Sequence, residues 1–167
     1  MSQRSYDDKN KLYLIPTPIG NIEDITYRAI NILNEVDLVF SEDTRETIKL
    51  LNYYGIKKPL ISAHKFNEEQ AVIKMLEALN QNKNIALVSD RGTPLISDPG
   101  NLCVKRILEG GFSVVSLPGA TALIPAITAS GLSCDRFLFY GFLENRQSKR
   151  KEELKNLKST KYTIIFY

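Results

Sequence analysis

The sequence contains no long hydrophobic run. None of its apolar stretches approaches the roughly 18 residues that span a bilayer, and the polar opening MSQRSYDDKNK has no apolar segment behind it of the kind that forms a secretory signal. We therefore expect a cytoplasmic protein with no membrane-bound segment.

Cysteine and histidine are scarce. The two cysteines, Cys103 and Cys134, lie in different segments without a CxxC spacing, so the sequence predicts neither a disulfide framework nor a zinc site. We expect both to be buried free thiols. The single histidine, His64, cannot build a multi-histidine metal site, and we expect no bound metal.

The familiar nucleotide and hydrolase motifs are also missing. The chain contains no GxGxxG, no GxxxxGK[ST] and no GxSxG. Their absence disfavours a Rossmann dinucleotide site, a P-loop and a serine-hydrolase elbow. The net charge of +3 is only a weak indication of a polyanionic partner.

Alternation of short apolar runs with segments of helical period is the main pattern that the sequence does contain. With 43% hydrophobic and 25% charged residues, the composition is that of a globular protein, and 167 residues suit one ordinary domain. Asp24 is a possible N-cap of the first helix, and Gly55, Gly111 and Gly131 follow helix ends. We predict strands at residues 12–15, 38–40, 60–63, 85–88, 114–117, 137–142 and 162–167, and helices at 25–33, 44–54, 67–80, 102–108 and 122–129, with a charged helical stretch between the last two strands.

This order predicts an α/β fold with a mainly parallel, twisted sheet and flanking helices, because each parallel pair needs a crossover that a helix supplies. Ligands of such sheets bind beyond the carboxyl ends of the strands. The loops expected there are PTPIGN, SEDTRE, HKFNEE, SDRGTPLISDPG and PGATA, all polar, small or rich in glycine and proline. We expect the functional site along this edge.

Several polar residues of these loops have a structural explanation as well as a functional one. Asp98 precedes Pro99 and a helix, which is the pattern of an N-cap followed by proline at the first helical position. Asp43 could cap the helix that follows it, and His64 could be a hydrogen-bonding loop residue. Asp90 has no helix of its own to cap, which favours a functional role.

The last third of the chain is rich in basic residues. Such a run is either a solvated helix face or a surface that contacts phosphates, and the sequence leaves both open. Between Glu144 and Lys161 it contains seven basic residues: Arg146, Lys149, Arg150, Lys151, Lys155, Lys158 and Lys161.

Five segments, in order and spacing, carry a resemblance to a known family: LYLIPTPIGNIEDITYRAINIL, FSEDTRET, LVSDRGTPLISDPG, VVSLPGATA and SGLSCDRFLFYGFL. They resemble the bacterial small-subunit ribosomal RNA cytidine 2′-O-methyltransferases of the tetrapyrrole methylase superfamily. The resemblance implies a two-domain, homodimeric enzyme that uses S-adenosylmethionine to methylate a cytidine ribose in the RNA of the small ribosomal subunit.

The resemblance also implies roles for individual residues. Asp43 is the first candidate for the base that accepts the ribose proton, with Arg45 and Glu42 beside it in the second loop. Two positions depart from the family pattern, because Arg91 stands where a small residue is usual and Phe66 where a second histidine is typical. The positions matching donor-binding residues are Pro18, Gly20, Ser89, Asp90, Leu95, Thr121 and Ala122, and those expected to contact RNA are His64, Asn67, Glu68, Arg91, Lys149, Arg150 and Lys151.

The family continues past the final TIIFY, so we expect this chain to hold one domain and the start of another. The expected organisation is a polar tail at 1–11, an N-terminal α/β methylase domain at 12–141, and a basic linker, helix and first strand of an incomplete second domain at 142–167. The last strand should then lack a full sheet. Two alternatives are a tetrapyrrole-type methylase of small molecules and a non-catalytic fragment that binds RNA or protein.

Overall fold

The computed structural model describes residues 10–167, so the expected polar tail lies almost wholly outside the described residues. Lys11, assigned to that tail, is instead the buried first residue of a strand. The chain forms two compact units, Met1–Thr121 and Ala122–Tyr167. The domain ranges 12–141 and 142–167 stay a prediction, because compact units of one chain need not coincide with the domains of a family.

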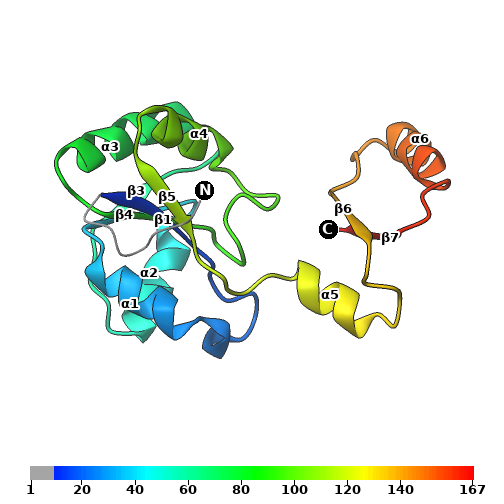
Figure 1. Cartoon of the computed structure of the whole chain (residues 1–167), viewed down its shortest axis with the longest axis horizontal. Coiled ribbons are helices and arrows are strands. Elements are labelled where there is room, and N and C mark those ends of the chain that lie inside the picture. The colour runs from blue at the N-terminus through cyan, green and yellow to red at the C-terminus, as the bar shows by residue number, and fades with distance from the viewer. Residues whose placement is uncertain (1–9) are drawn as a thin grey trace. The chain divides into compact units, whose positions relative to one another are not determined.

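A five-stranded parallel sheet forms the centre of the first unit (Figure 1). Its order is β3-β2-β4-β1-β5, and every pairing is parallel. This confirms the predicted α/β class. The strands are β1 (Lys11–Ile15), β2 (Leu38–Ser41), β3 (Leu60–Ser62), β4 (Ile85–Val88) and β5 (Ser113–Ser116).

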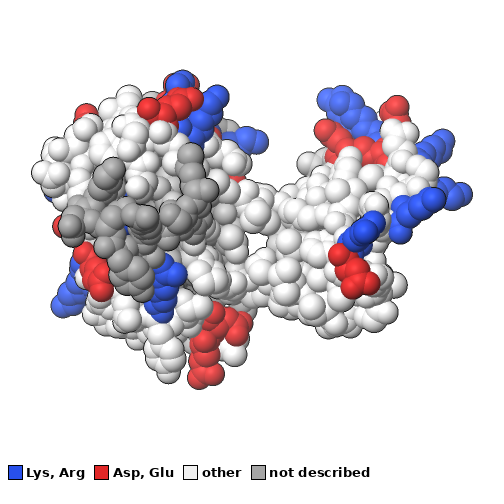
Figure 2. Space-filling view, viewed as in Figure 1, with Lys and Arg blue, Asp and Glu red and all other residues white. Residues whose placement is uncertain are grey.

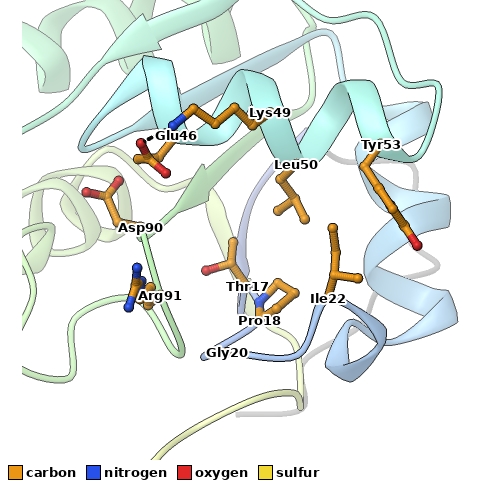
Figure 3. A pocket seen from close by; sticks show the side chains of 10 residues that line it. All are labelled: Thr17, Pro18, Gly20, Ile22, Glu46, Lys49, Leu50, Tyr53, Asp90 and Arg91. Carbon is orange, nitrogen blue, oxygen red and sulfur yellow. Dashed lines mark hydrogen bonds and ion pairs between the residues drawn. The ribbon is translucent and has the colours of Figure 1, made fainter.

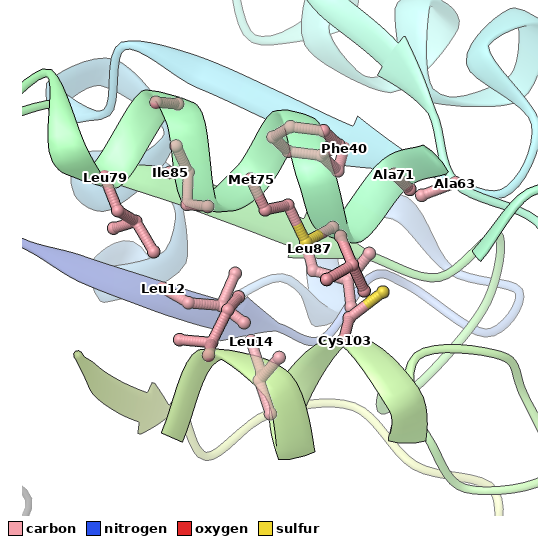
Figure 4. Packing of buried hydrophobic residues seen from close by; sticks show 13 residues of the cluster. Leu12, Leu14, Phe40, Ala63, Ala71, Met75, Leu79, Ile85, Leu87 and Cys103 are labelled. Carbon is pink, nitrogen blue, oxygen red and sulfur yellow. The ribbon is translucent and has the colours of Figure 1, made fainter. Parts of the chain in front are cut away.

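Helices cover both faces of this sheet because successive strand residues point to opposite sides. In β4, Ile85 and Leu87 pack with α3 and α4, whereas Ala86 and Val88 pack with α1 and α2. Figure 4 shows the first of these two layers, where Met75 of α3 and Cys103 of α4 lie over the strands. The helices are α1 (Tyr27–Glu35), α2 (Thr44–Tyr53), α3 (Glu68–Asn80) and α4 (Asn101–Glu109).

Two of the predicted helix caps are wrong. Asp24 ends a short 3₁₀ helix, η1 (Ile22–Asp24), and the hydroxyl of Thr26 caps α1 instead by accepting the Ala29 amide. Asp98 does not cap α4, whose N-cap is Gly100. The prediction for α2 is confirmed, since the Asp43 side chain accepts from the backbone amide of Arg45.

Gly100 occupies the α4 cap because the backbone there suits only glycine. Its φ is +122°, and a Cβ atom would lie 2.9 Å from Cδ2 of Leu87 and 3.3 Å from Cδ1 of Leu95. The preceding loop residues Leu95 and Ser97 also have positive φ angles, of +74° and +66°. The long loop after β4 therefore reaches α4 through a series of left-handed turns, which moves Asp98 out of the capping position.

The second unit contains α5 (Leu123–Ala129), β6 (Phe137–Gly141), α6 (Gln147–Leu157) and β7 (Thr163–Phe166). Its two strands pair in parallel with each other, and within residues 10–167 they form a sheet of two strands only. The expectation of a final strand without a full sheet agrees with this pairing. Across both units, none of the described helices is long and apolar enough to cross a membrane.

The two thiols differ in their surroundings. Cys103 is buried in the core of the first unit, as predicted, but Cys134 is exposed in the second unit. The prediction for Cys134 is wrong because the turn between α5 and β6 leaves its residues on the surface.

Candidate functional site

Hydrogen bonds join the loops that leave the carboxyl ends of β1, β4 and β5. Thr17 and Gly92 exchange two backbone hydrogen bonds of 2.9 Å. The Thr17 hydroxyl donates to the Ser89 carbonyl at 3.0 Å, and the buried Ser89 hydroxyl donates to the Gly92 carbonyl at 2.8 Å. The Thr93 hydroxyl donates to the Ala120 carbonyl at 3.0 Å. These bonds hold the three loops in one arrangement within the first unit.

A cavity of about 560 Å³ opens between the β1 loop, the β4 loop and α2 (Figure 3). It brings together four residues singled out from the sequence: Pro18, Gly20, Asp90 and Arg91. The rest of the wall was not predicted from the sequence. Four of its residues, at positions 46, 49, 50 and 53, have the spacing of one helix face. These additional residues are Thr17, Ile22, Glu46, Lys49, Leu50 and Tyr53.

Asp43 and Asp90 meet at the edge of this cavity. The Asp43 amide donates to Oδ1 of Asp90 at 3.0 Å, which joins the loops after β2 and β4. The Asp43 carboxylate is already engaged, since it accepts from the amide of Arg45 at 2.8 Å and from Nη2 of its guanidinium at 2.6 Å. The hydrogen bonds of Arg45 lower the pKa of Asp43 to about 2. Asp43 is thus held ionised and fixed in place.

Glu42 differs from its neighbour Asp43 both in its hydrogen bonds and in the direction in which its pKa is shifted. Its side chain is partly buried, and within residues 10–167 no hydrogen bond or ion pair engages its carboxylate. Burial raises the pKa of the Glu42 carboxyl, and the nearby carboxylates of Asp90 and Asp98 raise it further. Burial and Asp90 likewise raise the pKa of Asp98. The edge of the sheet therefore holds one tightly paired carboxylate, that of Asp43, and two carboxyl groups with a raised proton affinity, those of Glu42 and Asp98.

The loop after β3 is a closed turn. The Asn67 side chain accepts from the His64 amide at 2.8 Å and donates to the Ser62 carbonyl at 3.1 Å, while Nδ1 of His64 accepts from the Phe66 amide at 3.2 Å. His64 is thus the hydrogen-bonding loop residue that the sequence allowed. The Glu68 carboxylate accepts from the Gly100 amide at 2.5 Å, at the start of α4. His64, Asn67 and Glu68 all have structural roles.

The wall of the cavity does not include four of the expected donor residues. Ser89 is buried beneath the β4 loop, and Leu95 lies in left-handed backbone against Gly100. Thr121 ends the first unit, and Ala122 begins the second as the N-cap of α5.

The basic residues Lys149, Arg150 and Lys151 lie in α6 of the second unit. All three are exposed, and no residue of α6 is buried. Figure 2 shows lysine and arginine side chains over this helix. A metal site is not indicated, since among the residues described no group of three or more His, Cys, Asp or Glu side chains could hold a metal ion.

Comparison with known proteins places this geometry in a family. The family model for tetrapyrrole (corrin/porphyrin) methylases matches residues 11–167. A Bacillus subtilis protein named ribosomal RNA small subunit methyltransferase I is 50% identical over 167 residues, which are all of this chain and 57% of that protein. The protein of the same name from Escherichia coli O157:H7 is 46% identical, over 99% of this chain and 58% of its own length. The chain thus spans little more than half the length of these relatives.

Solved structures support the fold. A crystal structure of diphthine synthase superposes with a TM-score of 0.76 at 15% identity, covering 95% of this chain and 64% of that one. A uroporphyrin-III-C-methyltransferase from Thermus thermophilus superposes with a TM-score of 0.60 at 19% identity, covering 79% of this chain and 60% of that one. Since the family model matches nearly the whole described sequence and the sheet has the same fold, the chain belongs to the tetrapyrrole (corrin/porphyrin) methylase family.

Proposed function

We propose that the protein transfers a methyl group from S-adenosylmethionine to the 2′-oxygen of a cytidine ribose in small-subunit ribosomal RNA. The observation that carries this proposal is the 50% identity, along the whole chain, with a relative named ribosomal RNA small subunit methyltransferase I. The cytidine and its 2′-oxygen are inferred from the motif resemblance. A cytoplasmic location and a homodimeric assembly belong to the same proposal.

The residues around the cavity fit the methyl donor. The donor supplies an electrophilic methyl group on a positively charged sulfur, and Asp90 offers a carboxylate of opposite charge at the cavity wall. Ile22 and Leu50 give an apolar surface suited to a purine. Gly20 borders open space at this wall, since a Cβ atom added there would meet nothing within 4 Å. Pro18 completes this part of the proposed donor site.

The remaining donor-site residues support the site in different ways. Ser89 acts as a positioning residue, because its hydroxyl holds the Gly92 carbonyl and hence the loop that carries Asp90. Leu95 shapes the same loop further on. Thr121, the last residue of the first unit, and Ala122, the N-cap of α5, are also proposed to contact the donor.

Glu42 is the group that we assign as general base. In this role its carboxylate takes the proton that the ribose 2′-hydroxyl loses. A base works best when its pKa lies near the working pH, and Glu42 departs from the ordinary glutamate value in that direction. Asp43, which the motifs placed first, is less suited because its carboxylate is bound by Arg45 and has a pKa of about 2.

Asp43 and Arg45 are then proposed to position the RNA. The Arg45 side chain is 85% exposed and is held by Asp43, so its guanidinium is fixed with most of its surface free. A fixed guanidinium is suited to a phosphate. Arg91 is exposed at the cavity wall and is proposed to contact another phosphate, as are Lys149, Arg150 and Lys151 of α6. His64, Asn67 and Glu68 are proposed to shape the RNA-facing loop after β3 rather than to contact RNA chiefly through their side chains.

The test is a methylation assay with the full-length protein on small ribosomal subunits from cells that lack the enzyme, with radiolabelled S-adenosylmethionine. We expect one ribose-methylated cytidine, mapped by resistance of the neighbouring phosphodiester to alkaline hydrolysis. Label on a base rather than a ribose would contradict the 2′-oxygen assignment. Transfer to tetrapyrroles with no transfer to the subunits would contradict the whole proposal.

A further inference from the structure

We propose that Lys65 and Phe66, at the tip of the loop after β3, form a stacking platform for an unpaired RNA base close to the methylated nucleotide. This inference rests on the proposed function, since it supplies a further contact for the RNA substrate. Neither residue has a role in the site as derived above. Both are exposed residues of the loop that follows the carboxyl end of β3.

Phe66 is almost fully exposed. Phe66 is 91% exposed, and its ring makes a T-shaped contact with the ring of His64, with the ring centroids 6.1 Å apart. An aromatic side chain normally gains stability by burial. Phe66 gains almost none among the described residues, and most of its ring surface is available to a planar partner.

Hydrogen bonds within the loop hold Phe66 in its exposed position. The Phe66 amide donates to Nδ1 of His64, and the Asn67 amide and side chain close the turn on the His64 carbonyl and amide. The Asn67 side chain also fixes the turn to the Ser62 carbonyl at the end of β3. A ring presented on a closed turn loses little freedom on binding, which favours stacking affinity.

The pairing of a ring with a neighbouring cation favours RNA as the partner. Lys65 is exposed beside Phe66, and both line a hollow of about 290 Å³ at the start of α3, whose wall also includes Glu68 and Glu69. The Glu68 carboxylate is engaged by the Gly100 amide. A cation next to an exposed ring is the combination with which proteins bind single-stranded nucleic acid, by phosphate contact and base stacking. The loop also lies next to the loop that carries Glu42, because β2 and β3 pair with Ser41 opposite Ser62 and the Ala63 amide donates to the Ser41 carbonyl at 2.8 Å. A nucleobase stacked on Phe66 would therefore lie at the loop adjacent to the proposed general base.

The test is equilibrium binding of the full-length protein to a fluorescein-labelled single-stranded RNA oligonucleotide, followed by fluorescence anisotropy over a series of salt concentrations. Phe66→Leu keeps an apolar side chain but removes the aromatic face, and we expect it to weaken binding at least about fivefold. Phe66→Tyr keeps the ring and should bind within about twofold of the unchanged protein. Lys65→Ala should reduce the slope of log K against log salt by about one.

Controls come from α4, where Lys105 is an exposed cation in the middle of the helix and Leu108 is an exposed apolar residue near its C-terminal end. Leu108→Ala and Lys105→Ala should leave affinity and salt slope unchanged. Equal binding by Phe66→Leu and Phe66→Tyr would overturn the inference, as would absence of RNA binding by the unchanged protein. Methylation of ribosomal subunits by Phe66→Leu with unaltered affinity would overturn the platform but leave the proposed function intact.

Discussion

The backbone amide of Asp43 donates a hydrogen bond of 3.0 Å to the carboxylate of Asp90. The two residues follow β2 and β4, which are neighbours in the sheet, so this bond connects the proposed catalytic loop to the proposed donor loop. Asp90 also lines the cavity. The same carboxylate therefore has two separable functions: its oxygen accepts the amide, and its negative charge faces the cavity.

Substitution of Asp90 can separate these functions. Asp90→Asn keeps an oxygen that accepts the Asp43 amide, so the free energy of unfolding should stay within about 0.5 kcal/mol of the original value. Asp90→Ala removes the acceptor and should cost about 0.5–1 kcal/mol. Loss of the charge should weaken binding of S-adenosylmethionine by about tenfold or more in both variants. Urea unfolding and isothermal titration calorimetry measure the two effects; unchanged donor affinity in Asp90→Asn would remove the carboxylate from the donor site.

Glu42 and Asp43 make opposite predictions for catalysis in the full-length protein. Glu42→Gln should lower kcat by about 10²–10⁴ because a general base is lost. Asp43→Asn should affect kcat far less, since Arg45 already occupies that carboxylate. The Glu42 carboxyl must be ionised to accept a proton, so kcat/KM of the unchanged protein should rise with pH through the raised pKa of Glu42. This rise should be absent from the pH profile of Glu42→Gln. Normal methylation by Glu42→Gln together with inactive Asp43→Asn would restore Asp43 as the base.

Local sequence patterns predicted the elements of the sheet. The run at residues 85–88 was predicted with the bounds of β4, because a strand covered by helices on both faces is apolar at every position. The order β3-β2-β4-β1-β5 was not predicted, since it depends on pairing between strands far apart in the chain. The prediction that Asp98 caps α4 was wrong for a related reason. The left-handed backbone at Leu95 and Ser97, which shifts the cap of α4 to Gly100, is set by packing around the loop.

The candidate site was only partly visible in the sequence. Strand order pointed to the loops, the family resemblance singled out Pro18, Gly20 and Asp90 within them, and the structure places these three residues around one cavity. The α2 wall was missed, although Glu46, Lys49, Leu50 and Tyr53 follow helical spacing, because nothing in the sequence shows which face of α2 meets the loops. The choice between Glu42 and Asp43 also required coordinates, since pairing and burial decide their pKa values.

Gly100 should be sensitive to the smallest substitution. Gly100→Ala forces a side chain into left-handed backbone, 2.9 Å from Cδ2 of Leu87, and should lower the free energy of unfolding by about 1–3 kcal/mol. Gly20→Ala is the matched control, because its Cβ atom would meet no atom within 4 Å. Urea unfolding measures both. Equal stability of the two variants would show that the loop can relax around Gly100.

The two thiols should differ in reactivity. Cys103 is buried, and burial raises its pKa to about 11, so at neutral pH it is neither accessible nor a thiolate. Cys134 is exposed and should react first with a disulfide reagent, with Cys134→Ser removing the fast phase. Because the folded pKa of Cys103 is raised, its contribution to stability is present below pH 9 and is lost as the pH rises toward about 11. A fast phase that persists in Cys134→Ser would contradict the burial of Cys103.

The basic residues of α6 should act on RNA through charge alone. Lys149, Arg150 and Lys151 are exposed, and no residue of α6 is buried, so replacing all three with serine should leave folding intact. Each lost phosphate contact reduces the magnitude of the slope of log K against log salt by about one. In the triple variant of the full-length protein, the magnitude of this slope should therefore fall by about two to three. A control variant with Lys57, Lys74 and Lys105 replaced by serine removes the same charge from exposed positions of the first unit. If both variants reduced the slope equally, the effect would come from net charge, and α6 would be a solvated helix face.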